Sequence, residues 1–283
     1  MVGLYRRQFV VRSITPYLRY VSAMLVCGFA TPAFAERAED KVWLQGGVFR
    51  AQVDTYARVD SPSLGLPGTR VDFEGDLGLD DKEWAPKIAG GVRLGKAFRI
   101  EADYFSLNRA GSTTLNRLLG VDDTVFPVGA VVDSSFDTKI WRIAGGWSPV
   151  LTDTTEVGLA IGVHLTDASF SISGTLPGVS GATLVERRAT TIPLPNIGLY
   201  ANHSFNKTFG IHAKADFFSI KLGDYKGRLI DAQLGFSARI QRNIGVGIAY
   251  RFVDYDVEVR KNDFGGKIEY KYYGPVAFVE VAF

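Results

Sequence analysis

The sequence predicts an all-β protein: a transmembrane antiparallel up-and-down β-barrel, with ten strands as the favoured count and eight or twelve as alternatives. Three observations support this prediction. Segments of alternating apolar and polar side chains recur along the chain, the connections between them are alternately short and long, and the first 35 residues have the layout of an export signal. After residue 35 no apolar stretch is long enough for a membrane-spanning helix.

The N-terminal segment predicts export and cleavage. Four arginines precede a short apolar run at 21–30, and an Ala-Phe-Ala site ends at Ala35, directly before Glu36. This order is that of a secretory signal peptide, and the apolar run is too short to span a membrane as a helix. We therefore expect residues 1–35 to be removed and residues 36–283 to form a single barrel domain.

Removal of the signal peptide changes the composition of the chain in two ways. It takes away the only cysteine, Cys27, so the mature chain has neither a disulfide nor a cysteine metal site. It also takes four arginines and no acidic residue, which changes the formal net charge from +2 to −2. Without a basic excess, the composition gives no indication of nucleic-acid binding.

The alternating segments define the expected strands, because a side-chain period of two is that of a β-strand. In chain order these strands are 42–54, 84–94, 98–104, 141–147, 157–165, 195–201, 209–217, 230–240, 244–252 and 273–283. From the second strand to the tenth, the apolar row that we expect to face lipid contains Ile88, Ile100, Ile143, Leu159, Ile197, Ile211, Leu234, Ile248 and Val279. The opposite row holds polar or small residues in each strand, as the lumen of a barrel requires.

The first strand has an ambiguous register. Arg50, Gln52 and Asp54 favour the lumen, but Gln45 would then face lipid. Tryptophans and tyrosines of the later strands are expected at the edges of the lipid-facing band, where interfacial aromatic girdles occur.

The connections separate a barrel from a soluble sandwich. Short turns are expected at 96–97, 149–154, 203–207 and 241–243, and long connections at 55–83, 108–136, 166–191, 222–229 and 254–270. Strict alternation of short and long connections is typical of outer-membrane barrels, which have short periplasmic turns and long external loops. Further alternation within the long connections predicts that several strands continue past the bilayer as external hairpins.

The last strand, 273–283, ends on the aromatic Phe283. It resembles the closing strand of Gram-negative outer-membrane β-barrels, in which this terminal signature is read by the assembly machinery. Together with the signal peptide, the strands and the loop asymmetry, the resemblance covers nearly the whole mature chain. It implies a location in the outer membrane and, as partners, outer-membrane lipid, lipopolysaccharide and the barrel-assembly machinery.

The expected lumen contains charges of both signs. These residues are Lys87, Arg93, Arg99, Glu101, Asp103, Arg142, Lys214, Asp216, Asp231, Arg239, Arg251 and Glu280. Because burying one sign alone is costly, we expect paired charges that bridge the lumen of a narrow barrel. A small pore is the alternative interpretation, since lumen glycines such as Gly91, Gly146, Gly158, Gly235 and Gly247 could leave space.

An acidic cluster lies in the first long connection: Asp72, Glu74, Asp76, Asp80, Asp81 and Glu83. Carboxylates at this density are a weak candidate for a Ca²⁺ or Mg²⁺ site that bridges lipopolysaccharide phosphates. The spacing matches no calcium loop, so we interpret the cluster as a solvated charge run and expect neither a metal nor a cofactor.

Three histidines are present, and only His164 is expected to face the lumen near the outer rim, where external substrates arrive. Omptin proteases and lipid A deacylases place catalytic histidines there, but no matching motif surrounds His164. We therefore expect a monomeric, non-enzymatic outer-membrane barrel with a structural or binding role through its external loops. The alternatives are a passive channel and a rim hydrolase of lipid or peptide that uses His164.

Overall fold

The computed structural model describes residues 40–61, 66–121, 124–175, 183–260 and 265–283. The predicted signal peptide, with Cys27, lies outside these residues. Within them, no helix is long and apolar enough to cross a membrane.

All regular structure in the described part of the chain consists of β-strands. In chain order they are β1 (Val42–Ser61), β2 (Leu66–Asp72), β3 (Lys82–Leu94), β4 (Phe98–Thr114), β5 (Leu119–Val121), β6 (Thr124–Phe126), β7 (Val131–Leu151), β8 (Thr155–Thr175), β9 (Thr183–Ser204), β10 (Phe209–Leu222), β11 (Tyr225–Arg239), β12 (Ile244–Arg260) and β13 (Gly265–Ala282).

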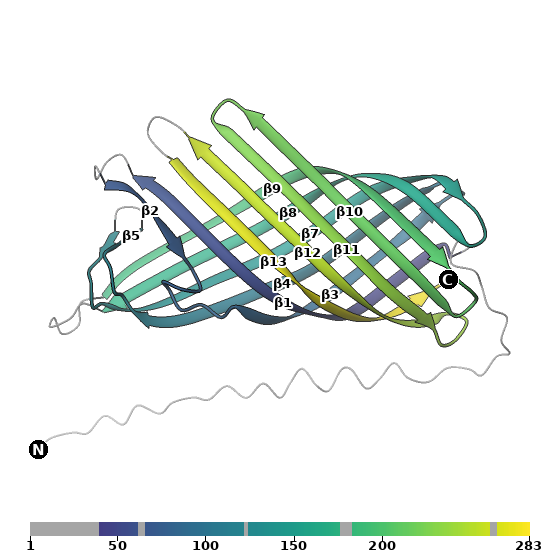
Figure 1. The fold of residues 1–283 in the computed structure, drawn as a ribbon, viewed down its shortest axis with the longest axis horizontal. Coiled ribbons are helices and arrows are strands. Elements are labelled where there is room, and N and C mark those ends of the chain that lie inside the picture. The colour runs from purple at the N-terminus through teal and green to yellow at the C-terminus, as the bar shows by residue number, and fades with distance from the viewer. Residues whose placement is uncertain (1–39, 62–65, 122–123, 176–182, 261–264) are drawn as a thin grey trace, which may run out of the picture. The chain divides into compact units, whose positions relative to one another are not determined.

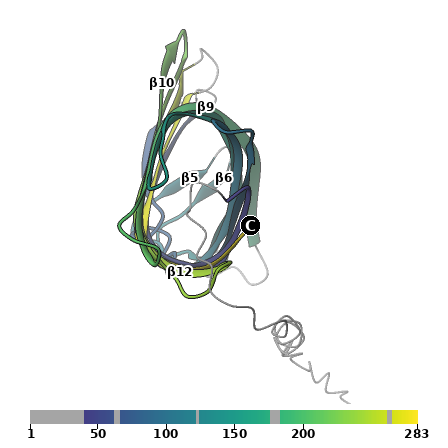
Figure 2. The same ribbon diagram turned by 90° about the vertical axis from the view of Figure 1, so that its right-hand side faces the viewer.

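Ten of these strands close into an antiparallel barrel, which confirms the predicted fold class and strand count. Consecutive barrel strands pair with one another, and β13 pairs back onto β1, so that the strands form a closed ring (Figure 2). Phe283 extends this seam: its N–H donates to the Val42 carbonyl at 2.9 Å, and the Val42 N–H donates to the Phe283 carbonyl at 3.0 Å. Outside the ring of ten, β2 pairs with the far part of β1, and β5 pairs with β6.

The short and long connections lie at opposite ends of the barrel, as predicted. The short turns occupy residues 95–97, 152–154, 205–208 and 240–243. We call this the short-turn end; the C-terminus lies toward it, and β2 and β5 lie at the other, long-loop end (Figure 1). Two predicted long connections, 222–229 and 254–270, were wrong: β10 and β11 are joined by only Gly223 and Asp224, and β12 and β13 by residues 261–264. Gly223 has a φ of 57°, a left-handed conformation that favours glycine in so tight a turn.

The structure resolves the register of β1. Gln45 points into the barrel with Trp43 and Phe49, and Arg50, Gln52 and Asp54 lie on the outer row. Arg50 stacks over the Trp84 ring at 5.2 Å from its centroid. Outward polar side chains are tolerated here because this part of β1 lies beyond the apolar band described next.

The outer surface near the short-turn end is a band of exposed apolar side chains. From β1 to β13 it includes Leu44, Ile88, Ile100, Ile143, Leu159, Ile197, Leu234, Ile248 and Val279. The band ends at the same height on neighbouring strands: Trp141 pairs with Leu165, and the next outward pair is Lys139 with Asp167. Strands β7 and β8 continue from there to Val131 and Thr175. These strands therefore extend beyond the apolar band.

The interior of the barrel differs along its length. Toward the long-loop end it is filled by a buried apolar and aromatic cluster that includes Phe49, Phe105, Phe136, Tyr270 and Tyr272. The segment 73–81 turns inward and adds Phe73, Leu77 and Leu79, and the β5–β6 hairpin adds Leu119 and Phe126. Toward the short-turn end the interior is lined by charged and polar side chains instead.

Candidate functional site

The predicted lumen charges all lie inside the barrel, and most of them form two sets of ion pairs that meet at His164. Their pairing could be expected from the mixed signs, but their partners could not, because residues far apart in sequence meet across the lumen. Whether these charges bind a ligand stays a prediction. We describe them in three parts: a central network, a lower network and a mouth cluster.

The central network is built around two arginines that are almost completely buried, Arg142 on β7 and Arg251 on β12. Arg251 donates to both carboxylate oxygens of Asp231, at 3.0 and 2.5 Å, and to Asp103 Oδ1 at 3.0 Å. The second oxygen of Asp103 accepts a hydrogen bond of 2.9 Å from the Lys214 ammonium. Each of these groups is thus held by partners on other strands.

Arg142 joins the central network to the next one. It donates to both carboxylate oxygens of Asp216, with Nη2 at 3.1 Å from Oδ1, and to Glu101 Oε1 at 2.5 Å. Glu101 also pairs with Arg99, at 3.1 Å. Bidentate arginine–carboxylate geometry of this kind satisfies the donors and acceptors of buried charges.

The lower network, closer to the short-turn end, centres on Glu156 of β8. Arg93 donates to both of its carboxylate oxygens at 3.0 Å, and Arg99 donates at 3.4 Å. The Ser148 hydroxyl donates to Glu156 at 2.5 Å and lies 2.7 Å from the Tyr200 hydroxyl. Glu156 was not among the predicted lumen charges because it lies next to a turn. It lies two positions before Gly158, so it belongs to the same inward row as Gly158 and His164.

The mouth cluster lies at the short-turn end. Arg239 donates to Asp40 at 2.6 and 3.3 Å, and Glu280 accepts a hydrogen bond of 2.6 Å from the Gln45 side chain. Asp40 precedes the first strand, so strand periodicity gave no signal for it. These contacts tie β1, β11 and β13 together where the barrel begins.

The space beside the lumen glycines is occupied by neighbouring side chains. A Cβ added at Gly158 would collide with the ring of Tyr200, and one at Gly247 would collide with the ring of Phe278. Similar collisions would occur at Gly91, Gly146 and Gly235. The missing side chains are therefore replaced by larger side chains of other lumen residues.

The acidic cluster of the first long connection is used for local hydrogen bonds. Asp72 accepts from the backbone N–H groups of Gly75 and Glu74, at 2.9 and 3.1 Å, and Asp76 accepts from the Asp72 N–H at 2.8 Å. Asp76 also pairs with Arg117. Among the described residues, these carboxylates form no group that could share a metal ion.

Glu74 leaves the rest of the acidic cluster and enters the barrel. Glu74 pairs with Arg109 and accepts a hydrogen bond of 2.8 Å from the Thr55 N–H. Nη2 of Arg109 in turn donates to Thr55 Oγ1 at 2.7 Å. Burial raises the pKa of Glu74 above its ordinary value, and the Thr55 N–H and Arg109 oppose that shift. Arg109 was missed by sequence analysis because it falls in an expected loop that proved to be part of β4.

His164 lies deep inside the barrel, not near the outer rim as predicted. It is 0% exposed, and β8 continues beyond it to Thr175. The prediction was wrong because it took the apolar part of the strand for its full length. Nδ1 of His164 lies 3.1 Å from the Tyr255 hydroxyl, which also points into the lumen.

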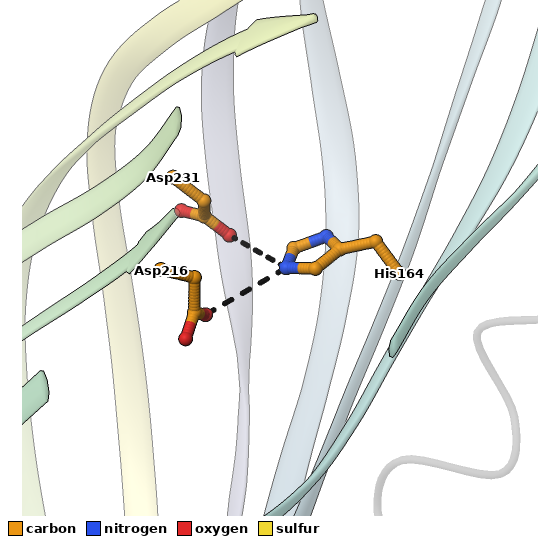
Figure 3. Close-up of side chains that lie close together, drawn as sticks. All are labelled: His164, Asp216 and Asp231. Carbon is orange, nitrogen blue, oxygen red and sulfur yellow. Dashed lines mark ion pairs between the residues drawn. The ribbon is translucent and has the colours of Figure 1, made fainter. Parts of the chain in front are cut away.

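His164, Asp216 and Asp231 form the single group in the described residues whose ligand atoms could converge on a metal ion (Figure 3). The His164 Nε2 lies 3.6 Å from Asp216 and 3.7 Å from Asp231. Each carboxylate, however, already accepts two hydrogen bonds from an arginine. A divalent cation would have to sit beside two guanidinium groups, so the donor set does not fit a metal.

A cavity of 140 Å³ occupies the charged half of the lumen. Its lining extends from Thr154 and Ser204 at the short-turn end to Lys87 and Arg142 in the central part of the barrel. A second cavity of 120 Å³ lies at the short-turn end and shares Thr154, Ser204 and Glu280 with the first. The open space of the lumen therefore adjoins the short turns.

Similarity to solved structures identifies the fold of this chain. No family model and no curated protein sequence matches this chain. The solved structure of the outer membrane protease OmpT from Escherichia coli is similar over 90% of this chain and 100% of that chain, with a TM-score of 0.55 and 12% identity. Neisserial surface protein A matches with a TM-score of 0.32 and 14% identity, over 86% of this chain and 97% of that chain. The Pseudomonas putida toluene transporter TodX matches with a TM-score of 0.33 and 9% identity, over 86% of this chain and 90% of that chain. The closed ten-stranded barrel and its similarity to OmpT identify the fold as that of the Gram-negative outer-membrane β-barrels.

Proposed function

We propose that this chain is an integral outer-membrane barrel that conducts no solutes, catalyses no reaction and has a structural or binding role through its external half. In this proposal the short turns and the C-terminus face the periplasm, and the long-loop end projects from the cell. The exposed apolar band around the short-turn half supports a membrane position, because outer-membrane barrels face lipid with such a band.

The observation that carries the proposal is the filled long-loop half of the lumen. Phe49, Phe105 and Tyr272 are each 0% exposed, and their ring centroids are 5.5 to 6.1 Å apart. The same cluster continues outward through Phe136 and Tyr270, whose centroids are 5.5 Å apart. Dense aromatic packing of this kind supports a lumen that is closed toward the long-loop end.

The external half is also stabilised by strand pairing and by a hydrophobic core of its own. Strands β7, β8 and β9 extend well past the apolar band, and they are paired along that extension up to Thr175 and Thr183. Its interior is a hydrophobic core, so the extension does not depend on the membrane for burial of apolar surface. A rigid support of this kind suits loops that bind or protect at the cell surface.

The two alternatives receive less support. A passive pore would need an open path through the aromatic cluster. OmpT is a protease of the outer membrane, but a similarity at 12% identity carries the fold and not the activity. The chain has three histidines, and none lies at the external rim: His164 is buried, and His203 and His212 lie toward the short-turn end.

Conductance and orientation test the proposal. The refolded protein in a planar lipid bilayer should give no reproducible conductance steps. A cysteine at Ser169 on external β8 should react with a membrane-impermeant maleimide on intact cells, and a cysteine at Asp153 in a short turn should not. Stable channel openings would contradict the closed lumen. Labelling of the Asp153 variant alone would mean that the orientation is opposite to the one proposed.

The closed ring also leads us to expect a monomer, because none of the ten barrel strands presents an unpaired edge along its membrane part. Outer-membrane lipid, lipopolysaccharide and the assembly machinery are the partners that this proposal implies. Light scattering of the detergent-solubilised protein would measure the number of chains in each particle.

A further inference from the structure

Lys87 differs from the other charged residues of the lumen because it has no ionic partner. It lies on β3, opposite Gly47 on β1 and Phe105 on β4, and it is only 6% exposed. Within the described residues, its ammonium group makes neither a hydrogen bond nor an ion pair. Without such a partner, the ammonium depends for its solvation on what occupies the cavity that Lys87 lines.

The nearby carboxylates are already occupied by other cations. Asp103 accepts from Lys214 at 2.9 Å with one oxygen and from Arg251 at 3.0 Å with the other. Asp231 accepts two hydrogen bonds from Arg251. Lys87 therefore faces acidic groups that are held by stronger and closer donors.

The charge balance of the central and lower networks leads to the same conclusion. The carboxylates of the two networks are Glu101, Asp103, Glu156, Asp216 and Asp231. The cations are Lys87, Arg93, Arg99, Arg142, Lys214 and Arg251. These two networks hold one more cation than carboxylates, and the mouth cluster, with Asp40 and Glu280 against Arg239, offsets that difference for the lumen as a whole. The cation without a carboxylate contact is Lys87.

The cavity of 140 Å³ extends to Lys87. Lys214 and Gln233 line it as well, and the Gln233 side-chain oxygen is buried without a hydrogen-bond partner among the described residues. A single water needs roughly 10 to 15 Å³ by a comparable measure, so the cavity has room for a small organic molecule. Its other end lies at the short-turn end, next to Thr154 in the β7–β8 turn and Ser204 at the end of β9, which gives a path of entry from that side.

We propose that this cavity is a binding site for a small anion that presents a carboxylate or phosphate group to Lys87 and enters from the short-turn, periplasmic end. The anion would supply the ionic contact that Lys87 lacks, and Lys214, which lines the same cavity, would provide a second donor nearby. The site lies on the opposite side of the aromatic cluster from the external loops, so it is separate from the function proposed above.

The test measures binding of acetate and of inorganic phosphate to the refolded barrel in detergent at low ionic strength, by ligand-observed NMR and calorimetry. The wild-type protein should bind at least one of the two probes; which one binds identifies the preferred anionic group. Loss of one charge-assisted contact weakens binding by about ten- to a hundredfold, so Lys87→Met and Lys87→Gln should both show a decrease in this range.

Lys82→Met is the matched control, since Lys82 lies on the same strand, is 53% exposed and faces outward. It should bind as the wild type does. Heat-modifiable gel mobility and circular dichroism establish that each variant is folded; should Lys87→Met fail to fold, Lys87→Gln decides the outcome. Absence of binding to the wild type, or equal binding by a folded Lys87 variant, would refute the anion site.

Discussion

Arg251 on β12 donates a hydrogen bond of 3.0 Å to Asp103 on β4, although the two residues are 148 positions apart in sequence. The pair crosses the lumen and joins strands that are not neighbours in the barrel. Arg251 is held at the same time by Asp231, and its guanidinium carbon lies 4.9 Å from the centroid of the Phe105 ring. The central network and the aromatic cluster therefore meet at this residue.

Removal of one partner from this network should be strongly destabilising. Asp103→Asn removes the negative charge that Arg251 and Lys214 both contact. Breaking a buried ion pair in this way lowers the free energy of unfolding by about 3 to 5 kcal/mol. The free energy of unfolding in urea, measured for the protein refolded into lipid vesicles, gives the value. Arg228→Met at the exposed pair with Asp254 is the control and should cost less than about 1 kcal/mol. Equal effects of the two variants would mean that the central network adds no more stability than a surface pair.

Gly158→Ala should displace Tyr200. The new methyl group would overlap the Tyr200 ring, which stacks 3.4 Å from the Arg99 guanidinium and meets Ser148 at 2.7 Å. Overpacking in a filled interior costs about 1 to 3 kcal/mol, and the same unfolding measurement reports it. Gly46→Ala is a suitable control because a Cβ there would meet no atom within 4 Å. If Gly158→Ala were as stable as Gly46→Ala, the lumen would have space that the aromatic rings do not fill.

His164→Ala should not change hydrolysis of any peptide or lipid substrate. The imidazole is 0% exposed and faces Asp216, Asp231 and Tyr255, so external substrates cannot reach it. Assays of a peptide library and of lipopolysaccharide with intact cells, for the wild type and the variant, provide the measurement. An activity that is present in the wild type and absent from a folded His164→Ala protein would support the rim-hydrolase alternative instead.

Deletion of Phe283 should reduce assembly in the membrane more than it reduces stability. The residue is 68% exposed on the outer surface, and its backbone makes two of the contacts that close the seam with Val42. We expect less of the heat-modifiable form in outer-membrane fractions, whereas the protein refolded in detergent should keep its β-sheet circular dichroism. Phe283→Tyr keeps the aromatic ring and serves as the control. Normal membrane levels of the deletion variant would contradict a role of Phe283 in assembly.

A large part of the fold could be predicted from local sequence patterns. A period of two identifies a strand and assigns each side chain to one face, so the lipid-facing rows through Ile88 and Ile248 and the inward charges could be predicted without the structure. The same pattern underestimated the length of the strands. Beyond the apolar band the pattern inverts, as in β1, where Arg50 and Asp54 lie on the outer face and Ala51 and Val53 are buried in the core.

The sequence by itself thus predicted the barrel class, the favoured strand count, the alternation of connections between two ends and most of the charges that face the lumen. Only the tertiary structure decided which of these charges meet, how deep His164 lies, and that aromatic rings pack inside the long-loop half of the barrel. Periodicity gives the face of a residue but not its height, and height depends on how each strand is shifted relative to the others around the ring. For this reason Lys87 looks like any other lumen cation in the sequence, and only the folded barrel leaves it unpaired beside a cavity.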